Sequence, residues 1–356
     1  MTAVPTEVSP VRVTRWTRTS RFGTPAVTLI FAILFALPFM TALSNVRSVT
    51  DLLIFIILGS MWNLMAGYGG MESVGQQAYI GLGAYGFVVL ADQLGVDIFV
   101  AVLLAGLVAG VIAFLISFVA FRLVGGYFAI GTWVIAEIVK LIITQFPSLG
   151  LGSGISLYAM SSFDRDLRIA VSYWIALGVT MLALITCVLL VRSGFGLGLT
   201  AVRDDPTAAA TSGVDVNRAK RLVFVVSGIG TGIAGAIITI STLRVQPDSL
   251  FSVQWSVLMI FMVVIGGVGT IEGPIIGAII FWGLREALAD YGSLYLILLG
   301  VVAIVFALFF RGGIWGLVQK RRRFSVFPIG YSASFGAAEQ VDPERMTGPS
   351  GRREPG

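Results

Sequence analysis

Two ionisable residues lie inside a hydrophobic segment, where a charge needs a partner or a function. Glu137 and Lys140 belong to the apolar run 127–145 and are three residues apart, which places them on one face of a helix. Each charge costs about 2.5–3.5 kcal/mol at the centre of a membrane helix, and the apolar residues around the two recover roughly 3–5 kcal/mol in total. We therefore expect both side chains to avoid lipid, either as an ion pair that fixes helix packing or as part of a pathway.

A second group of polar residues lies in a glycine-rich part of the chain. Its members are Asn63, Glu72, Ser73, Gln76 and Gln77. We interpret them as a polar lining for substrate passage or gating, together with Glu137 and Lys140. The alternative is that they hydrogen-bond to backbone groups that the nearby glycines release from helical geometry.

Two glycine-rich stretches each contain a glutamate. They are GYGGMESVG at 67–75 and GGVGTIEGP at 266–274. Broken helices of this kind are tolerated in membranes where they are buried in protein or line a cavity. The GGVGT sequence is not followed by Lys-Ser/Thr as a P-loop requires, so we do not expect the chain to hydrolyse ATP by itself.

The residue types that support catalysis or metal binding are scarce. Histidine is absent, and Cys187 is the only cysteine and lies in an apolar run. This excludes His-based metal sites and every Ser–His or Cys–His triad. We predict no catalytic residue, no metal site and no cofactor. Arg285 and Glu286, near the end of an apolar run, are interpreted as an interface pair.

The elements that must position these residues are membrane helices. The chain has 356 residues, of which 56% are hydrophobic and 12% charged, whereas soluble domains are about 25% charged. We predict an all-α polytopic membrane helix bundle of about ten spans or re-entrant segments. The apolar runs are 25–43, 51–68, 73–92, 98–121, 127–145, 170–191, 221–243, 254–271, 274–289 and 293–310, and the short runs 73–92 and 274–289 could be re-entrant.

The positions of the basic residues predict the orientation. The net charge is +5, and the basic residues gather in a few segments between the apolar runs, as the positive-inside rule expects, rather than forming a nucleic-acid-binding patch. With ten crossings, the N-terminus and the C-terminus are both cytoplasmic. We predict a cytoplasmic tail at 1–24, a transmembrane domain at 25–320 with a cytoplasmic loop at 192–221, and a basic, then disordered tail at 321–356.

The loop 192–221 contains a short helix with clear start and stop signals. Asp205 can cap the first N–H groups, Pro206 suits the first helical position, and alanines follow. Gly213 supplies a left-handed stop. A helix this short is marginal alone, so we expect a larger surface to hold it.

Three separate motifs resemble one known family. They are WNLMAGYGGMESVGQQAYIGLGAY (62–85), GLGLTAVRDDPTAAATSGVDVNRAKRLVFVVSGIGTGIAGA (196–236) and VVIGGVGTIEGPIIGA (263–278). Together they resemble the transmembrane permease of the high-affinity branched-chain amino acid ABC importers. The likeness covers roughly residues 25–320.

The resemblance implies a transport subunit in the cytoplasmic (inner) membrane of a bacterium or archaeon, not an enzyme. Its implied partners are a second, related permease in a heterodimer, two cytoplasmic ATPase subunits, and a periplasmic or external binding protein for leucine, isoleucine and valine. ABC importers carry a cytoplasmic loop of the pattern Glu-Ala-Ala, three residues, then Gly, which docks into the ATPase. Ala208, Ala209 and Gly213 match this pattern, and Thr207 stands where the glutamate would be.

Other functions stay open at this point. An ABC permease for urea or amides would show the same motifs. A self-sufficient, ion-coupled secondary transporter could use Glu72, Glu137 and Lys140 as a relay. A membrane enzyme is disfavoured, because no catalytic constellation stands out.

Overall fold

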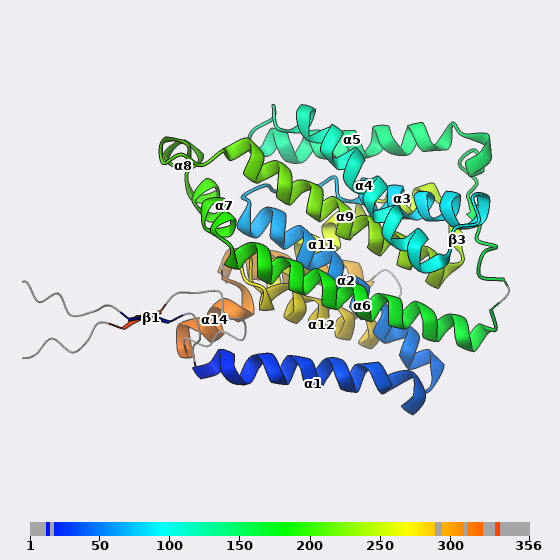
Figure 1. The fold of residues 1–356 in the computed structure, drawn as a ribbon, viewed down its shortest axis with the longest axis horizontal. Coiled ribbons are helices and arrows are strands. Elements are labelled where there is room, and N and C mark those ends of the chain that lie inside the picture. Colours follow the sequence, from blue (N-terminus) through cyan, green and yellow to red (C-terminus); the bar gives the residue numbers. More distant parts are fainter. Residues whose placement is uncertain are drawn as a thin grey trace, which may run out of the picture.

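The computed structural model describes residues 12–14, 18–161, 163–288, 294–309, 312–322 and 332–334. Its helices lie side by side, and most of their axes are close to parallel or antiparallel (Figure 1). The elements are β1 Arg12–Thr14, α1 Arg18–Met40, α2 Leu43–Asn63, the π-helical turn η1 Leu64–Tyr68, α3 Gln77–Val88, the π-helical turn η2 Val89–Gln93, α4 Ile98–Ala120, α5 Gly126–Thr144, the 3₁₀ turn η3 Pro147–Leu149, β2 Ile155–Ser156, α6 Arg165–Arg192, α7 Gly194–Asp204, α8 Pro206–Thr211, α9 Val216–Thr242, β3 Arg244–Val245, α10 Pro247–Leu250, α11 Gln254–Gly266, α12 Glu272–Ala287, α13 Leu294–Phe309, α14 Gly313–Arg322 and β4 Ser332–Ser334.

Six helical segments in the described residues are long and apolar enough to cross a membrane. They are Leu43–Tyr68, Ile98–Ala120, Gly126–Thr144, Arg165–Arg192, Val216–Thr242 and Pro247–Gly266. The chain is therefore an all-α, multi-pass protein, as predicted. Of the remaining predicted runs, 25–43 lies on α1, while 73–92, 274–289 and 293–310 contain the shorter helices α3, α12 and α13. Residues 289, 293 and 310 of these runs lie outside the described residues.

Several predicted boundaries move in the structure. The first helix begins at Arg18 rather than at the start of the apolar run 25–43. Hydrophobicity indicates which part of a helix can lie in the membrane, but the helix itself can extend beyond that part. The run 73–92 begins with a non-helical segment, and its helix consists of the 12 residues of α3 and the 5 residues of η2. At about 1.5 Å per residue this helix by itself is shorter than a bilayer core of about 30 Å. The loop 192–221 contains a second helix, α7, that was not predicted.

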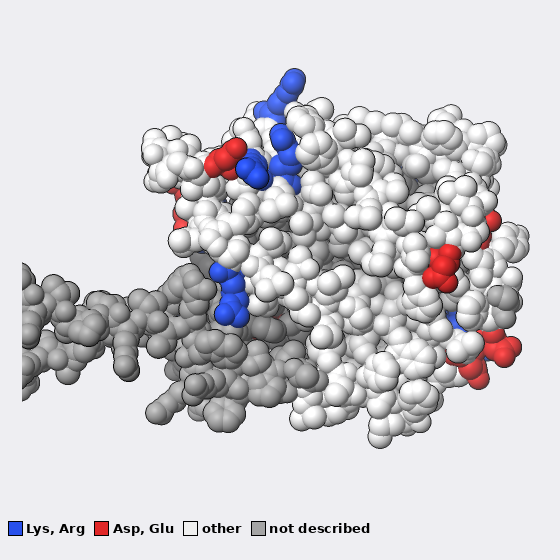
Figure 2. All heavy atoms as spheres, in the orientation of Figure 1, with Lys and Arg blue, Asp and Glu red and all other residues white. Residues whose placement is uncertain are grey.

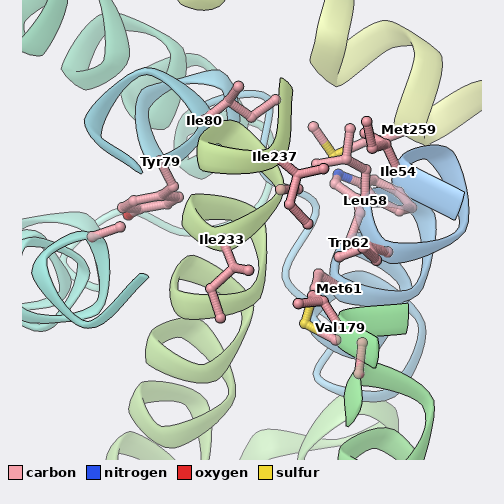
Figure 3. Packing of buried hydrophobic residues seen from close by; sticks show 14 of the residues in the cluster. Ile54, Leu58, Met61, Trp62, Tyr79, Ile80, Val179, Ile233, Ile237 and Met259 are labelled. Atoms are coloured by element: carbon pink, nitrogen blue, oxygen red, sulfur yellow. The ribbon is translucent and has the colours of Figure 1, made fainter. Parts of the chain in front are cut away.

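Helix α9 occupies the centre of the bundle, between α3 and α4 on one side and α2 on the other (Figure 3). The close approach depends on small residues on α9 and its neighbours. A side chain on Gly232 would collide with the Cβ of Ala109 on α4, and one on Gly83 of α3 would collide with the carbonyl oxygen of Gly232. Small residues at such contacts let helix backbones pack closely.

The two ends of the bundle differ. Helices α7, α8 and α14 and the antiparallel pair β1–β4 lie at the left end in Figure 1, and the antiparallel pair β2–β3 lies at the right end. On the face shown in Figure 2 the charged side chains gather at the two ends, and the belt between them is almost uncharged. An uncharged surface between two charged ends is what a lipid bilayer favours on this face.

Candidate translocation and coupling site

Residues 69–76 leave the helical path between η1 and α3. Gly70 has a φ of +66°, a conformation that L side chains rarely adopt. A side chain on Gly75 would collide with the carbonyl oxygen of Thr132 on α5. The hydroxyl of Thr132 accepts a hydrogen bond from the backbone N–H of Val74 at 3.2 Å. The glycines therefore let a non-helical segment pass directly against α5.

Two glutamines at the start of α3 connect this break to the centre of the bundle. The Gln76 Oε1 atom accepts a hydrogen bond from the Thr231 hydroxyl on α9 at 3.1 Å, and the Gln77 Oε1 atom accepts one from the Ser256 hydroxyl on α11. Both glutamines are fully buried. They bridge α3, α9 and α11, so they could reach a substrate only after these helices move apart.

Asn63 joins the two glycine-rich stretches. Its Nδ2 donates to the carbonyl oxygen of Thr270 at 2.8 Å, and its Oδ1 accepts from the N–H of Gly269 at 2.8 Å. A side chain on Gly67 would collide with Asn63 Oδ1 and with the Gly269 backbone. The breaks at 67–75 and 266–274, far apart in the sequence, therefore meet at one junction.

Arg203 on α7 binds the same junction from outside the bundle. Its Nη1 donates to the carbonyl oxygen of Gly67 at 2.9 Å, while its Nε and Nη2 contact Asp204 at 2.9 Å. A residue of the loop 192–221 is thus directly hydrogen-bonded to the end of α2–η1. Movement of α7 must disturb this contact or pull on the break.

Helix α8 has the predicted capping geometry. Asp205 Oδ1 accepts hydrogen bonds from the N–H groups of Thr207 at 2.8 Å and Ala208 at 3.1 Å, and Pro206 is the first helical residue. Gly213 has a φ of +87° and ends the helix. Ala209 is buried, and the other residues of α8 are exposed, so the helix stands out from the bundle (Figure 1).

The charged pair predicted on one helix face forms on α5. The Lys140 Nζ atom lies 3.4 Å from a Glu137 carboxylate oxygen and 2.9 Å from an Asp248 oxygen on α10. Lys140 is two helical turns beyond Thr132, or about 12 Å along α5, so this group is separate from the junction around Gln76. These distances are those expected of ion pairs that fix the packing of α5 against α10.

The two remaining residues of the predicted polar group, Ser73 and Glu72, differ in burial. Ser73 is buried; its hydroxyl accepts from the N–H of Gly75 at 3.1 Å and its carbonyl oxygen from the Trp62 indole at 2.9 Å. Glu72 is exposed. Ser73 and Asn63 therefore satisfy backbone groups near the glycines, the alternative to a pathway lining. In the described part of the chain no group of three or more His, Cys, Asp or Glu residues could hold a metal ion.

Arg203, Thr231, Ser256 and Asp248 were not predicted as site residues. Hydroxyls in apolar helices commonly bond to carbonyls of their own helix, and the sequence carries no sign that Thr231 and Ser256 reach other helices instead. Arg203 looks like a surface residue because two aspartates follow it. Only the folded chain places it against Gly67.

The comparisons with known proteins place the chain in one family. A family model described as a branched-chain amino acid transport system permease component matches residues 44–309, from the start of α2 to the end of α13. The chain belongs to this family. Every element of the junction described above lies within the matched part of this permease.

The permease is similar to curated proteins over most of its length. It is 27% identical to the high-affinity branched-chain amino acid transport system permease protein LivM of Salmonella typhimurium, over 78% of this chain and 71% of LivM. The identity to LivM of Escherichia coli is also 27%, over 76% of this chain and 69% of LivM. The ribose import permease protein RbsC of Haemophilus influenzae is 28% identical over 44% of this chain and 50% of RbsC. No solved structure matches the chain.

The family and the helices together establish the broad role. The chain is a permease subunit of an ABC importer, a multi-pass protein of the inner membrane and not an enzyme. Family members act with ATPase and substrate-binding partners in general.

Proposed function

We propose that this permease forms part of the translocation pathway for leucine, isoleucine and valine, and that separate ATPase subunits drive it through α8. The printed names of its LivM relatives support the substrate class. The observation that carries the mechanism is the hydrogen bond from Arg203 on α7 to Gly67, because it ties the protruding α7–α8 segment to the junction of both helix breaks.

The proposed movement follows these contacts. An ATPase that closes on ATP pushes α8, and α7 transmits the push because the two helices are joined at Asp205. Arg203 then acts on the Gly67 carbonyl, and Asn63 carries the displacement to Gly269. Alternating access in transporters is largely rigid-body movement of one group of helices against another, around a site that broken helices form.

We further propose ten crossings, with the non-helical segment 69–76, α3 and η2 together forming one of them. The apolar helices run alternately in the two directions in Figure 1, and α7, α8, α14 and the β1–β4 pair lie at one end. This supports cytoplasmic N- and C-termini, with tails at 1–24 and 321–356 and a transmembrane domain at 25–320. Most residues of 321–356 lie outside the described part of the chain.

The proposed partners are a second, related permease, two ATPases and an external binding protein in a bacterial or archaeal membrane. Helix α5 supports the heterodimer. Only 17% of the apolar stretch of α5 is buried inside the bundle, against 78% for α9. Helix α5 lies at the edge of the bundle in Figure 1. The Glu137 side chain on α5 is 49% exposed, and a charge is costly where it faces lipid. A second permease on this face would remove that cost.

Replacing Gly213 with valine tests the role of α8. The change strains the left-handed end of the helix without a steric clash, since nothing lies within 4 Å of the new Cβ. In reconstituted vesicles we expect ATP-driven leucine uptake to fall at least tenfold while ATP hydrolysis continues. Gly213→Asn is the matched control, because asparagine tolerates this conformation. It should keep most of the uptake.

Two results would contradict the proposal. Normal uptake by Gly213→Val would show that the end of α8 does not couple to the ATPase. Uptake that requires an ion gradient and neither ATP nor partner subunits would instead establish the secondary transporter.

A further inference from the structure

A cavity opens at the end of the bundle opposite α7 and α8. Its volume is about 290 Å³, and it lies between α2, α10, α11 and α12. Pockets for drug-sized ligands are about 300–1,000 Å³, so this one suits a small metabolite. Under the proposed topology it opens toward the outside, where substrate is delivered.

The inner wall of the cavity is aromatic. Phe55 on α2 and Phe281 on α12 are buried and pack edge to face, with ring centroids 4.9 Å apart. Leu258 and Trp255 on α11 complete the wall. The Trp255 indole donates to the carbonyl oxygen of Ser249 at 2.9 Å, which holds the ring in place. This wall offers an apolar side chain a fixed apolar surface.

Two opposite charges border the same cavity. Asp248 on α10 and Arg285 on α12 both line it, and their side chains are 84% and 46% exposed. Lys140 contacts the Oδ1 atom of Asp248 at 2.9 Å, and Asp51 contacts the Nη1 atom of Arg285 at 3.4 Å. These partners hold the two groups in position and leave each with hydrogen-bonding capacity, since a carboxylate has about four acceptor sites and a guanidinium has five N–H donors.

We propose that this cavity is a binding site in the permease itself for a free, zwitterionic α-amino acid with an apolar side chain. Asp248 accepts from the α-ammonium group, Arg285 donates to the α-carboxylate, and Phe55, Phe281 and Leu258 contact the side chain. The inference rests on the proposed function for the direction of transport and the substrate class. A sugar carries no formal charge that would match either group.

The pairing of charges supports this ligand chemistry. A zwitterion presents one positive and one negative group on a single carbon atom, next to its side chain. The cavity combines one group of each sign with an aromatic wall, so all three parts of the ligand find complementary surface. The amino acid released by an external binding protein would pass this site before it reaches the buried glutamines.

Binding to the assembled importer without its binding protein tests the site directly. Saturation-transfer NMR with leucine should give a signal that Asp248→Asn and Arg285→Gln each weaken at least fivefold. Leucinamide, which lacks the carboxylate, and 4-methylpentanoate, which lacks the ammonium group, should give weak signals. Glu286→Gln is the matched control, because Glu286 does not line the cavity and contacts Ser48. It should bind leucine like the unaltered importer.

Uptake separates this site from a docking surface. With saturating, leucine-loaded binding protein we expect Asp248→Asn and Arg285→Gln to lower uptake at least fivefold. The binding-protein concentration for half-maximal ATPase stimulation should stay unchanged, and this stimulation also shows that the variants fold. A shift in that concentration with unchanged leucine binding would overturn the proposal in favour of protein docking. Normal leucine binding and uptake by both variants would also overturn it.

The same experiments distinguish a wrong proposed function from a wrong proposed site. If the unaltered importer, supplied with ATP and its binding protein, takes up no leucine, then the proposed substrate is wrong and the site falls with it. If the unaltered importer takes up leucine and both variants bind and take up leucine equally well, the proposed function stands and only the proposed site is wrong.

Discussion

Asn63 shows at the scale of one residue how the glycine-rich breaks are held. Its amide satisfies one backbone N–H and one carbonyl group of the segment 266–274, each at 2.8 Å. The Asn63 side chain is buried, and a backbone group that loses its partner in such a place is costly. The amide is chemically suited to this task because it carries both a donor and an acceptor.

We predict that Asn63→Leu destabilises the protein. The change leaves the Gly269 N–H and the Thr270 carbonyl group unpaired, at about 1–3 kcal/mol each. The apparent melting temperature in detergent should fall by several degrees. Asn217→Leu, the same change at an exposed position at the start of α9, is the control. Equal melting temperatures for both variants would contradict the role given to Asn63.

At the scale of elements, the contacts of α9 with α3 and α4 determine how the bundle packs. Gly83 and Gly232 bring α3 against α9, and Gly106 brings α4 against Ile233. These contacts place the start of α3, with its two glutamines, beside Thr231. The small residues therefore let the helices pack closely and also position these polar groups.

We predict that Gly83→Ala destabilises the bundle, because its new methyl group would collide with the backbone of Gly232. Overpacking of this kind costs about 1–3 kcal/mol. Gly178→Ala on α6 is a matched control, since nothing lies within 4 Å of its new Cβ. The control should be neutral or slightly stabilising. Thermal unfolding in detergent measures both, and a stable Gly83→Ala variant would show that the α3–α9 contact is looser than described.

At the scale of the whole molecule, the direction of transport depends on which end of the bundle faces the cytoplasm. We predict that the end with α7 and α8 is cytoplasmic. Thr211→Cys should react with a membrane-impermeant maleimide only after the cells are permeabilised, and Ser249→Cys should react in intact spheroplasts. Cys187 is buried and gives little background. The opposite labelling pattern would reverse the orientation and remove the proposed coupling through α8.

The sequence alone determined the class of protein, the capped helix at 205–213 and the placement of Glu137 and Lys140 on one face of α5. These follow from local physics, since hydrophobic length, capping residues and the spacing i, i+3 act within one segment. Three family motifs also indicated the permease family. The glycines of 67–75 indicated the break before α3, but helix α7 was missed.

The tertiary structure alone decided which polar residues meet. Arg203 binds Gly67 across 136 positions of sequence, and Asn63 binds Gly269 across 206. Gln76 and Gln77 turned out to be buried bridges between helices rather than groups on an open lining. Such contacts depend on the rotation and register of packed helices, and these are set by which small residues allow close approach, a property of pairs of helices and not of one segment.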